Sequence, residues 1–586
     1  MSRRYISNYD KYPVVPVSAS RDDCETGWQA IARRLQSSIR AGRFVVCVEC
    51  YPGCFEKEIE KQLVDALKPQ LVLRVAECYL PEAAIQSLCA RDLGDDLVFA
   101  FMGKYELHEF LDKRELAKQR NRLSQASGLT LVVGTGATLL AEQWDLLLYC
   151  DMARWEIQQR QRTGEIPNLG LQNCTDRPQL KYKRGYFVDW RVADRLKKTL
   201  ISKIDFLLDT NQRDLPKMIS GAQHLEGLKN AAHRPFRVVP FFDPGPWGGQ
   251  WMKKVCDLPR DAENYAWCFD CVPEENSLLL GFGDVKVEIP SINLVFQRPH
   301  ELLGEAVHAR FGTEFPIRFD FLDTMDGGNL SFQVHPLTEY IHEQFGMSYT
   351  QDESYYMLDA GDDGCVFLGL KENIDANQMM ADLLEAQEGA IQFDADKYVN
   401  RFPAKKHDHF LIPAGTPHCS GKNSMVLEIS ATPYIFTFKM WDWGRLGLDG
   451  TPRPIHLQHG FRNIQWDRTT PWVEKNLVNT IAPVAEGAGW REERTGLHER
   501  EFIETRRHWF TAPVPHSTAG AVNVFNLCEG QEATVESPRG KFSPFIVHYA
   551  ETFIVPAAVG DFTIRPHGPS EGKQCATIKA FVRTNP

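Results

Sequence analysis

The sequence predicts a multidomain protein in which an α/β domain with a parallel sheet precedes an all-β part. Apolar runs alternate with amphipathic stretches through the first 160 residues, the pattern of strands separated by helices. From about residue 237 the texture changes to many short strand-like segments with frequent Gly and Pro, as in jelly rolls. The length of 586 residues also exceeds what one hydrophobic core supports, so several domains are expected.

The N-terminal region is predicted to form a doubly wound, mostly parallel sheet. Five apolar runs are interpreted as its buried strands, at residues 43–51, 70–79, 96–103, 129–141 and 145–151. The stretch from about Tyr182 to Gly227 is predicted to be helical, because its segment KKTLISKIDFLLDTNQRDLPKMI has a 3.6-residue apolar period. We place the end of this domain near residue 232.

One segment of this domain, DLLLYCDMARWEIQQRQRTGE, loosely resembles the strand and arginine-bearing lid helix of P-loop nucleoside kinases. The loop after the first strand, from Tyr51 to Lys57, lacks the Gly-Lys-Ser/Thr that cradles phosphate and places magnesium. The turn Gly134-Thr135-Gly136 could approach an anion. Two interpretations stay open: a degenerate, non-catalytic kinase-like domain over residues 1–232, which we favour, or a working binding site.

Bulk composition excludes several classes of partner. The net charge of -11 leaves no basic footprint for nucleic acid or for an anionic membrane. The N-terminus lacks the apolar segment of a secretion signal, and no apolar run approaches a membrane span. The 15 scattered cysteines suit reduced thiols, so a cytoplasmic location is expected. The clusters Cys268/Cys271 and Cys47/Cys50/Cys54 lack the second pair that a structural zinc needs.

The all-β part is predicted to contain two jelly rolls, over residues 233–460 and 461–586. Short strand-like segments run from SLLLGF, VKVEI and INLVF to YIFTFKMW, with one helical insertion, ANQMMADLLEAQ. A second strand-rich block follows residue 459 and ends with CATIKAFVR. Turn signals separate the segments of both blocks, which is typical of antiparallel sheets.

Four polar residues of the first jelly roll form a candidate metal site. Gln333 and His335 are two apart on a predicted strand and project from the same face. Glu353 begins a later apolar run, and His418 follows a Pro-Gly turn. Two imidazoles, a carboxylate and a carboxamide oxygen would suit zinc. On spacing alone, however, histidines that pack in the core remain the favoured interpretation.

Several motifs in order add a family resemblance. The blocks SFQVHP, DESYYMLDA, FLGLKENID and FLIPAGTPHCSGK, preceded by PWGG at residues 246–249, resemble successive signatures of the type I phosphomannose isomerases, which are cupins. The resemblance covers residues 237–460 well and 460–586 loosely, and it implies that both jelly rolls are cupin domains. It also implies one zinc ion per chain and interconversion of mannose 6-phosphate and fructose 6-phosphate through a cis-enediol. The implied zinc ligands are Gln333, His335, Glu353 and His418.

The resemblance also suggests roles for other residues, with two departures from the family pattern. Glu428 matches a family glutamate and Lys439 a family arginine, and both are predicted to be catalytic. Ser331 and Gln351 are predicted to bind substrate, and so is Arg445, because it is near enough to Lys439 in sequence to supply a further cation. Gln351 stands where the family commonly has lysine, so one cation is missing. Lys439 keeps its charge but loses the bidentate fork of arginine.

Two functions therefore remain. The favoured one is a zinc-dependent isomerase of a hexose phosphate, whose partner is a small sugar phosphate. The alternative is a non-catalytic zinc-containing cupin that binds a sugar or sugar phosphate as a sensor or scaffold. The intact ligand set favours both equally, whereas Gln351 favours the binder. Ser331, Glu428 and the cation at position 439 favour the isomerase. The oligomeric state is not predicted. His407, His409, His456 and His459 are expected to be structural.

Overall fold

A computed structural model describes residues 7–431, 434, 436–496 and 498–584. The chain forms two compact units, neither of which is contiguous in sequence. The α/β unit comprises Val14–Ala231 and Ser277–Arg298. The β unit joins Ala232–Asn276 and Pro299–Pro586 to the N-terminal segment that ends at Pro13. No helix in the described ranges is both long and apolar enough to span a bilayer.

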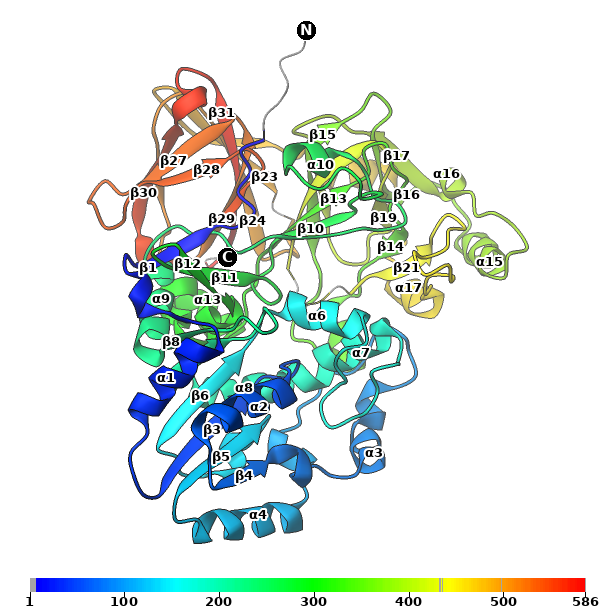
Figure 1. The fold of residues 1–586 in the computed structure, drawn as a ribbon. Coiled ribbons are helices and arrows are strands. Elements are labelled where there is room, and N and C mark those ends of the chain that lie inside the picture. Colours follow the sequence, from blue (N-terminus) through cyan, green and yellow to red (C-terminus); the bar gives the residue numbers. More distant parts are fainter. Residues whose placement is uncertain (1–6, 432–433, 435, 497, 585–586) are drawn as a thin grey trace. The chain divides into compact units, whose positions relative to one another are not determined.

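The α/β unit is built on a seven-stranded sheet with the order β2-β8-β7-β6-β3-β5-β4 (Figure 1). Its strands are β2 (Glu25–Thr26), β3 (Phe44–Cys50), β4 (Leu71–Arg74), β5 (Leu129–Gly134), β6 (Leu146–Asp151), β7 (Phe206–Asp209) and β8 (Lys217–Ser220). Strand β3 pairs in parallel with both β5 and β6. The chain therefore builds the sheet first on one side of β3 and then on the other, as a doubly wound sheet requires.

Helices connect these strands. They are α1 (Trp28–Ser38), α2 (Glu56–Leu67), α3 (Glu82–Leu93), α4 (Lys113–Gln125), α5 (Ala137–Leu140), α6 (Arg154–Arg162), α7 (Pro178–Arg184), α8 (Trp190–Leu200) and α9 (Gly221–Ala232). A π-helical segment, Gly185–Asp189, joins α7 to α8. The central strands β3 and β6 of the sheet are buried along their whole length.

Three expectations for this unit are wrong. Residues 96–103 form no strand, because the Asp96 carboxylate accepts the Val98 and Phe99 amides and holds the chain in a turn. The predicted helical stretch 182–227 contains strands β7 and β8. The segment INLVF is a helix, α11 (Ile292–Gln297). Short apolar runs suit a buried helix and a buried strand equally, so the sequence could not decide between them.

Residues 277–298 group with the α/β unit, although the sequence analysis assigned them to the first jelly-roll range. Strand β11 (Ser277–Phe282) pairs in parallel with β1 (Val14–Ser18) and antiparallel with β12 (Val285–Pro290). These strands form a three-stranded sheet of their own.

The first sandwich, drawn mainly in green to yellow in Figure 1, has two antiparallel sheets. The sheet β18-β15-β20-β13-β10-β9 contains β9 (Phe241–Asp243), β10 (Trp267–Cys271), β13 (Arg318–Asp323), β15 (Glu353–Ala360), β18 (His409–Ile412) and β20 (Ser424–Ser430). The facing sheet β17-β16-β19-β14-β21 contains β14 (Phe332–Val334), β16 (Cys365–Leu370), β17 (Val399–Pro403), β19 (His418–Ser420) and β21 (Phe438–Trp441).

Helices of the β unit connect its strands. They are α10 (Trp251–Val255), α12 (Pro299–Leu303), α13 (Glu305–Phe311), α14 (Thr338–Phe345), α15 (Ala376–Gln387), α16 (Ala395–Tyr398), α17 (Leu457–Asn463) and α18 (Thr470–Asn476). Helix α15 coincides with the predicted insertion ANQMMADLLEAQ. The Asp375 carboxylate caps it by accepting two backbone amides of its first turn.

The second sandwich, orange to red in Figure 1, also has two antiparallel sheets. The sheet β22-β23-β24-β31-β26-β29 contains β22 (Ala482–Gly487), β23 (Trp490–Gly496), β24 (Ile503–Phe510), β26 (Asn523–Glu529), β29 (Thr552–Val555) and β31 (Cys575–Val582). The other, β25-β30-β27-β28, contains β25 (Val514–Ser517), β27 (Glu532–Glu536), β28 (Phe545–His548) and β30 (Asp561–Pro566). Apolar side chains of both sheets form a single core between them.

Candidate metal centre and its polar surroundings

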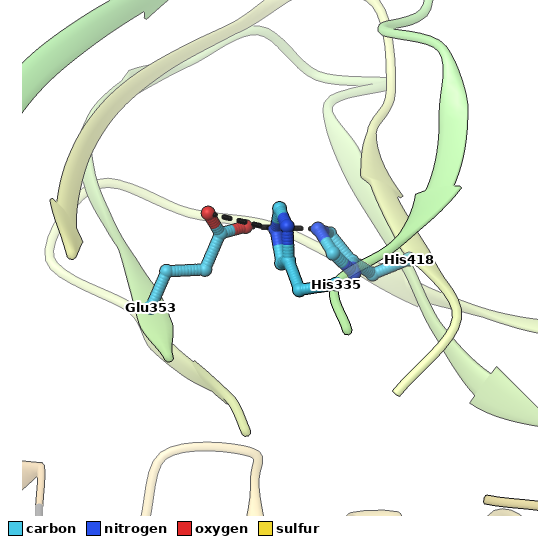
Figure 2. A group of neighbouring side chains, drawn as sticks. All are labelled: His335, Glu353 and His418. Atoms are coloured by element: carbon cyan, nitrogen blue, oxygen red, sulfur yellow. Dashed lines mark ion pairs between the residues drawn. The ribbon is translucent and has the colours of Figure 1, made fainter. Parts of the chain in front are cut away.

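Three buried side chains from different parts of the first sandwich converge on one point (Figure 2). Glu353 opens β15 in one sheet, whereas His418 opens β19 in the facing sheet and His335 follows β14. The Glu353 carboxylate lies 2.8 Å from His418 Nε2 and 3.1 Å from His335 Nε2. One ligand atom from each residue lies within 4.8 Å of the others, so the three could hold a metal ion together.

Backbone carbonyls orient both imidazoles. His335 Nδ1 lies 2.8 Å from the Phe436 carbonyl oxygen, and His418 Nδ1 lies 2.8 Å from the Thr416 carbonyl oxygen. A carbonyl only accepts, so each Nδ1 carries the hydrogen and each Nε2 keeps its lone pair. Metal-binding histidines commonly have their second nitrogen held in this way. The two backbone contacts therefore direct both Nε2 atoms towards the Glu353 carboxylate.

Gln333 is the fourth residue of the predicted ligand set, and the structure brings it to the same place. It pairs across the sheet with His418, and its side-chain amide nitrogen lies 3.3 Å from His418 Nε2. The nitrogen and oxygen of a side-chain amide are interchangeable by rotation, so the turned amide presents an oxygen there. Two imidazoles, one carboxylate and one amide oxygen match the donors that zinc prefers.

Gln351 connects this cluster to Glu428. Its amide nitrogen donates to Glu353 Oε2 at 2.9 Å and to Glu428 Oε1 at 3.3 Å, and its oxygen accepts the Phe436 amide at 3.1 Å. Gln351 thus holds two carboxylates near each other. Burial raises the pKa of Glu428 well above its usual range, and the neighbouring carboxylates of Glu353 and Asp320 raise it further.

Lys439 lies on strand β21 of the facing sheet, directly opposite Gln333 on the neighbouring strand β14. Directly opposite residues share a face, so its side chain points to the side of Gln333. Among the described residues its ammonium has no hydrogen-bond or ion-pair partner within normal distance. Burial lowers the pKa of Lys439 to about 7, and Arg453 lowers it while Asp442 opposes the shift.

Ser331 and Arg445 belong to a second polar cluster, centred on the buried Asp442. The Ser331 hydroxyl donates to Asp442 Oδ1 at 2.9 Å, and Arg445 donates to the same oxygen at 2.6 Å. Arg453 donates to Asp442 Oδ2 at 2.8 Å and to the Ser331 hydroxyl at 3.1 Å. The two guanidiniums outweigh the one carboxylate, so this cluster is cationic overall.

Comparison with known proteins finds curated relatives, solved structures and a family match. A curated relative, the mannose-6-phosphate isomerase of Streptococcus mutans, is 26% identical over 216 residues, which are 36% of this chain and 62% of the relative. Mannose-6-phosphate isomerase ManA of Bacillus subtilis is 25% identical over 239 residues, 39% of this chain and 68% of ManA. The chain is similar to mannose-6-phosphate isomerases. It spans less than two thirds of the length of the first of these relatives.

Two further matches complete the comparison. The solved mannose 6-phosphate isomerase from Bacillus subtilis aligns with 59% of this chain and 99% of its own, at 18% identity and a TM-score of 0.48. Residues 27–233 match a family described as a domain of unknown function, DUF8485. That match leaves the loose kinase resemblance of the N-terminal region without support from the comparisons.

The other histidines considered in the sequence lie outside the candidate metal centre. His407 contacts the Tyr356 hydroxyl and Glu529, and His409 Nδ1 lies 3.0 Å from the Thr495 carbonyl oxygen. His459 lies 2.7 Å from the Tyr340 hydroxyl and stacks on the Phe438 ring. In the described part of the chain, His335, Glu353 and His418 form the one cluster of three or more His, Cys, Asp or Glu with metal-site spacing.

In the α/β unit, backbone groups of the Gly134-Thr135-Gly136 turn and of the loop after β3 are hydrogen-bonded to charged side chains of the chain. Glu56 accepts the Thr135 amide at 2.9 Å, and Glu49 accepts the Gly136 amide. The Arg160 guanidinium donates to the Gly53 carbonyl at 3.0 Å. The Thr135 and Gly136 amides, which could otherwise bind a phosphate, are thus already bonded to carboxylates of the chain.

The sequence analysis missed four polar residues near the centre: Arg318, Asp320, Tyr355 and Asp442. In RFDFLD the charged residues alternate with phenylalanines, so one face of β13 is polar although the strand is buried. Arg318 pairs with Asp320 at 2.6 Å. Burial raises the pKa of Asp320 to about 6, although Arg318 opposes the shift. Charged residues at period two in a buried strand were the available signal.

Proposed function

We propose that the first sandwich is a metal-dependent aldose–ketose isomerase that acts on a hexose phosphate, with mannose 6-phosphate and fructose 6-phosphate as the favoured pair. One observation carries the proposal. Two oriented imidazoles and a carboxylate converge in the first sandwich, in a chain whose relatives are mannose-6-phosphate isomerases.

The proposed cofactor is one zinc ion, held by Gln333, His335, Glu353 and His418. When bound, zinc would polarise the sugar carbonyl and stabilise the negative charge that develops during enolisation. Gln351 and the two backbone carbonyls that hold the imidazoles keep these groups oriented. The protein thus supports the proposed ligands with hydrogen bonds from several elements.

The proton transfers are assigned to Glu428 and Lys439. Isomerisation moves a proton between C1 and C2, so an acid/base group must reach both carbons. Glu428 is tied to the cluster through Gln351, and Lys439 lies opposite Gln333. The cationic cluster of Ser331, Arg445 and Arg453 is the proposed phosphate end, because its guanidiniums are suited to phosphate oxygens.

The test is a coupled assay on metal-replete protein with a panel of hexose and pentose phosphates. We expect turnover of mannose 6-phosphate that stops when a chelator removes the metal and returns when zinc is added back. No turnover of any member by protein that contains one zinc per chain would contradict the proposal.

The second candidate is a zinc-containing protein that binds a sugar or sugar phosphate without turning it over. The contacts of Gln351 favour it, because a neutral amide stands where a cation would stabilise charge in the reaction. A sugar phosphate that protects the zinc-loaded protein against unfolding, without isomerisation, would establish this function instead.

A further inference from the structure

The inward face of the sheet that carries Glu353 can be identified from strand register. Glu353 bonds to His418 of the facing sheet, so its side chain points between the two sheets. Across the sheet Glu353 lies opposite Ser430, which in turn lies opposite Arg318. Directly opposite residues of antiparallel strands share a face, so all three point into the sandwich.

The next inward row follows from the pleat. Two residues further along each strand lie Tyr355, Glu428 and Asp320, which are again directly opposite one another. The next residue on β15, Tyr356, points the other way, and its hydroxyl contacts His407 and Cys528. Strands β13, β20 and β15 therefore line one wall of the interior with six adjacent polar residues, which we call the polar floor: Arg318, Asp320, Glu353, Tyr355, Glu428 and Ser430.

In addition to Glu353 Oε1, which faces His418, and Ser430 Oγ, three atoms of the polar floor are buried without a hydrogen-bond partner. They are Arg318 Nη1, Asp320 Oδ1 and the Tyr355 hydroxyl, from side chains that are at most 3% exposed. The Tyr355 hydroxyl lies close enough to Glu353 to interact with it electrostatically, but it makes no hydrogen bond of normal geometry. Buried polar atoms almost always have partners, from protein or from a bound molecule. One donor, one acceptor and one hydroxyl that does both thus face the interior beside the candidate metal centre.

We propose that the polar floor binds the hydroxyl groups of the sugar, with Tyr355, Asp320 and Arg318 as specificity-determining residues. The inference rests on the isomerase or sugar-binding function proposed above. Sugar hydroxyls donate and accept at once, which matches the mixed set of free atoms. The floor holds three carboxyl groups against one guanidinium, so it disfavours phosphate. The phosphate is therefore directed to the opposite, cationic cluster around Arg445 and Arg453.

The experiment measures binding of D-mannose, mannose 6-phosphate and inorganic phosphate to zinc-loaded protein by calorimetry. Tyr355→Phe removes only a hydroxyl that makes no hydrogen bond, so the fold is expected to persist. We expect this variant to bind both sugars more weakly by the same factor, about 3- to 10-fold. Its affinity for inorganic phosphate and its zinc content should stay unchanged. The volume-conserving double variant Arg318→Met/Asp320→Leu should weaken sugar binding further, again without an effect on phosphate binding.

Tyr356→Phe is the matched control, because the same atom is removed one residue away on the outer face. It should lower thermal stability and leave every dissociation constant unchanged. The proposal that the polar floor binds sugar hydroxyls is contradicted by wild-type protein that binds neither sugar. It is also contradicted by a Tyr355→Phe variant that binds both sugars as tightly as wild type. Tight sugar binding without turnover in the wild type instead contradicts the proposed isomerase activity, and it agrees with sugar binding by the polar floor.

Discussion

The two sandwiches are built alike but fill their interiors differently. In the first, the inward positions of β13, β15 and β20 carry carboxylates, a guanidinium and hydroxyls beside two histidines of the facing sheet. In the second, inward positions of both sheets carry Phe525, Phe553 and Phe562 among other apolar side chains. The same architecture can therefore enclose a candidate reaction site or a packed core. Residues at every second strand position decide which.

The largest effect should come from removing the candidate ligands. The double variant His335→Ala/His418→Ala should lower zinc affinity at least 10²-fold, since even residues behind the ligands typically contribute 10- to 100-fold. Isomerase activity should fall with it. Elemental analysis of protein purified without added metal measures the zinc content.

The matched control lies in the second sandwich. His508 and His516 are also buried, and their rings are 4.5 Å apart. The pair His508→Gln/His516→Gln should leave zinc content at about one per chain if the comparison between the sandwiches holds. Zinc that persists in the first double variant and disappears in the second would reverse the assignment.

The second prediction concerns the apolar interior. Phe525 is fully buried and stacks on Phe553 with ring centroids 5.2 Å apart. Phe525→Ala should lower the free energy of unfolding by about 3–5 kcal/mol, because the cavity cannot refill. Denaturant titration measures this loss, and zinc content should stay unchanged in the folded protein. A concurrent loss of zinc would show that the two interiors are coupled.

The third prediction tests Gln351. Its amide holds Glu353 and Glu428 together but carries no charge. Gln351→Lys would place an ammonium between two carboxylates, and we expect turnover of mannose 6-phosphate to rise by about 10-fold or more. The control Gln351→Met keeps the length and loses all three side-chain hydrogen bonds, so turnover should fall. Steady-state kinetics at saturating zinc would separate these outcomes, and equal rates in all three proteins would show that the position is not part of the machinery.

The last prediction is a pH dependence of stability that originates outside the polar floor. Burial lowers the pKa of His409 to about 3 in the folded protein, with Arg507 adding to the shift. The unfolded chain, with an ordinary histidine pKa near 6.5, therefore binds a proton that the folded chain refuses. Above about pH 6.5, His409 therefore does not affect the free energy of unfolding. Below that pH it lowers the free energy of unfolding by up to about 1.4 kcal/mol for each unit that the pH falls towards 3.

His409→Asn removes this titration. The variant should show a flatter decline of unfolding free energy between pH 6.5 and 4.5 than the wild type, in denaturant titrations at each pH. Parallel curves for the two proteins would mean that His409 becomes protonated without cost.

The sequence by itself determined the parts that depend on local pattern. The parallel strands β3, β5 and β6, helix α15, and the many short strands of the β unit follow from periodicity and turn residues. The motifs also pointed to His335, Glu353 and His418 as one candidate group, and the structure brings these three residues together. These features are encoded within a few neighbouring residues, so one chain suffices to predict them.

Only the tertiary structure decided the rest. The helix at 292–297 and the strands at 206–220 depend on what surrounds short apolar runs, which the runs themselves do not specify. Likewise, Arg318 and Tyr355 were two more residues in buried strands until the register placed them beside Glu353. Strand pairing joins residues far apart in sequence, and a shift of one position would turn every one of these side chains to the other face.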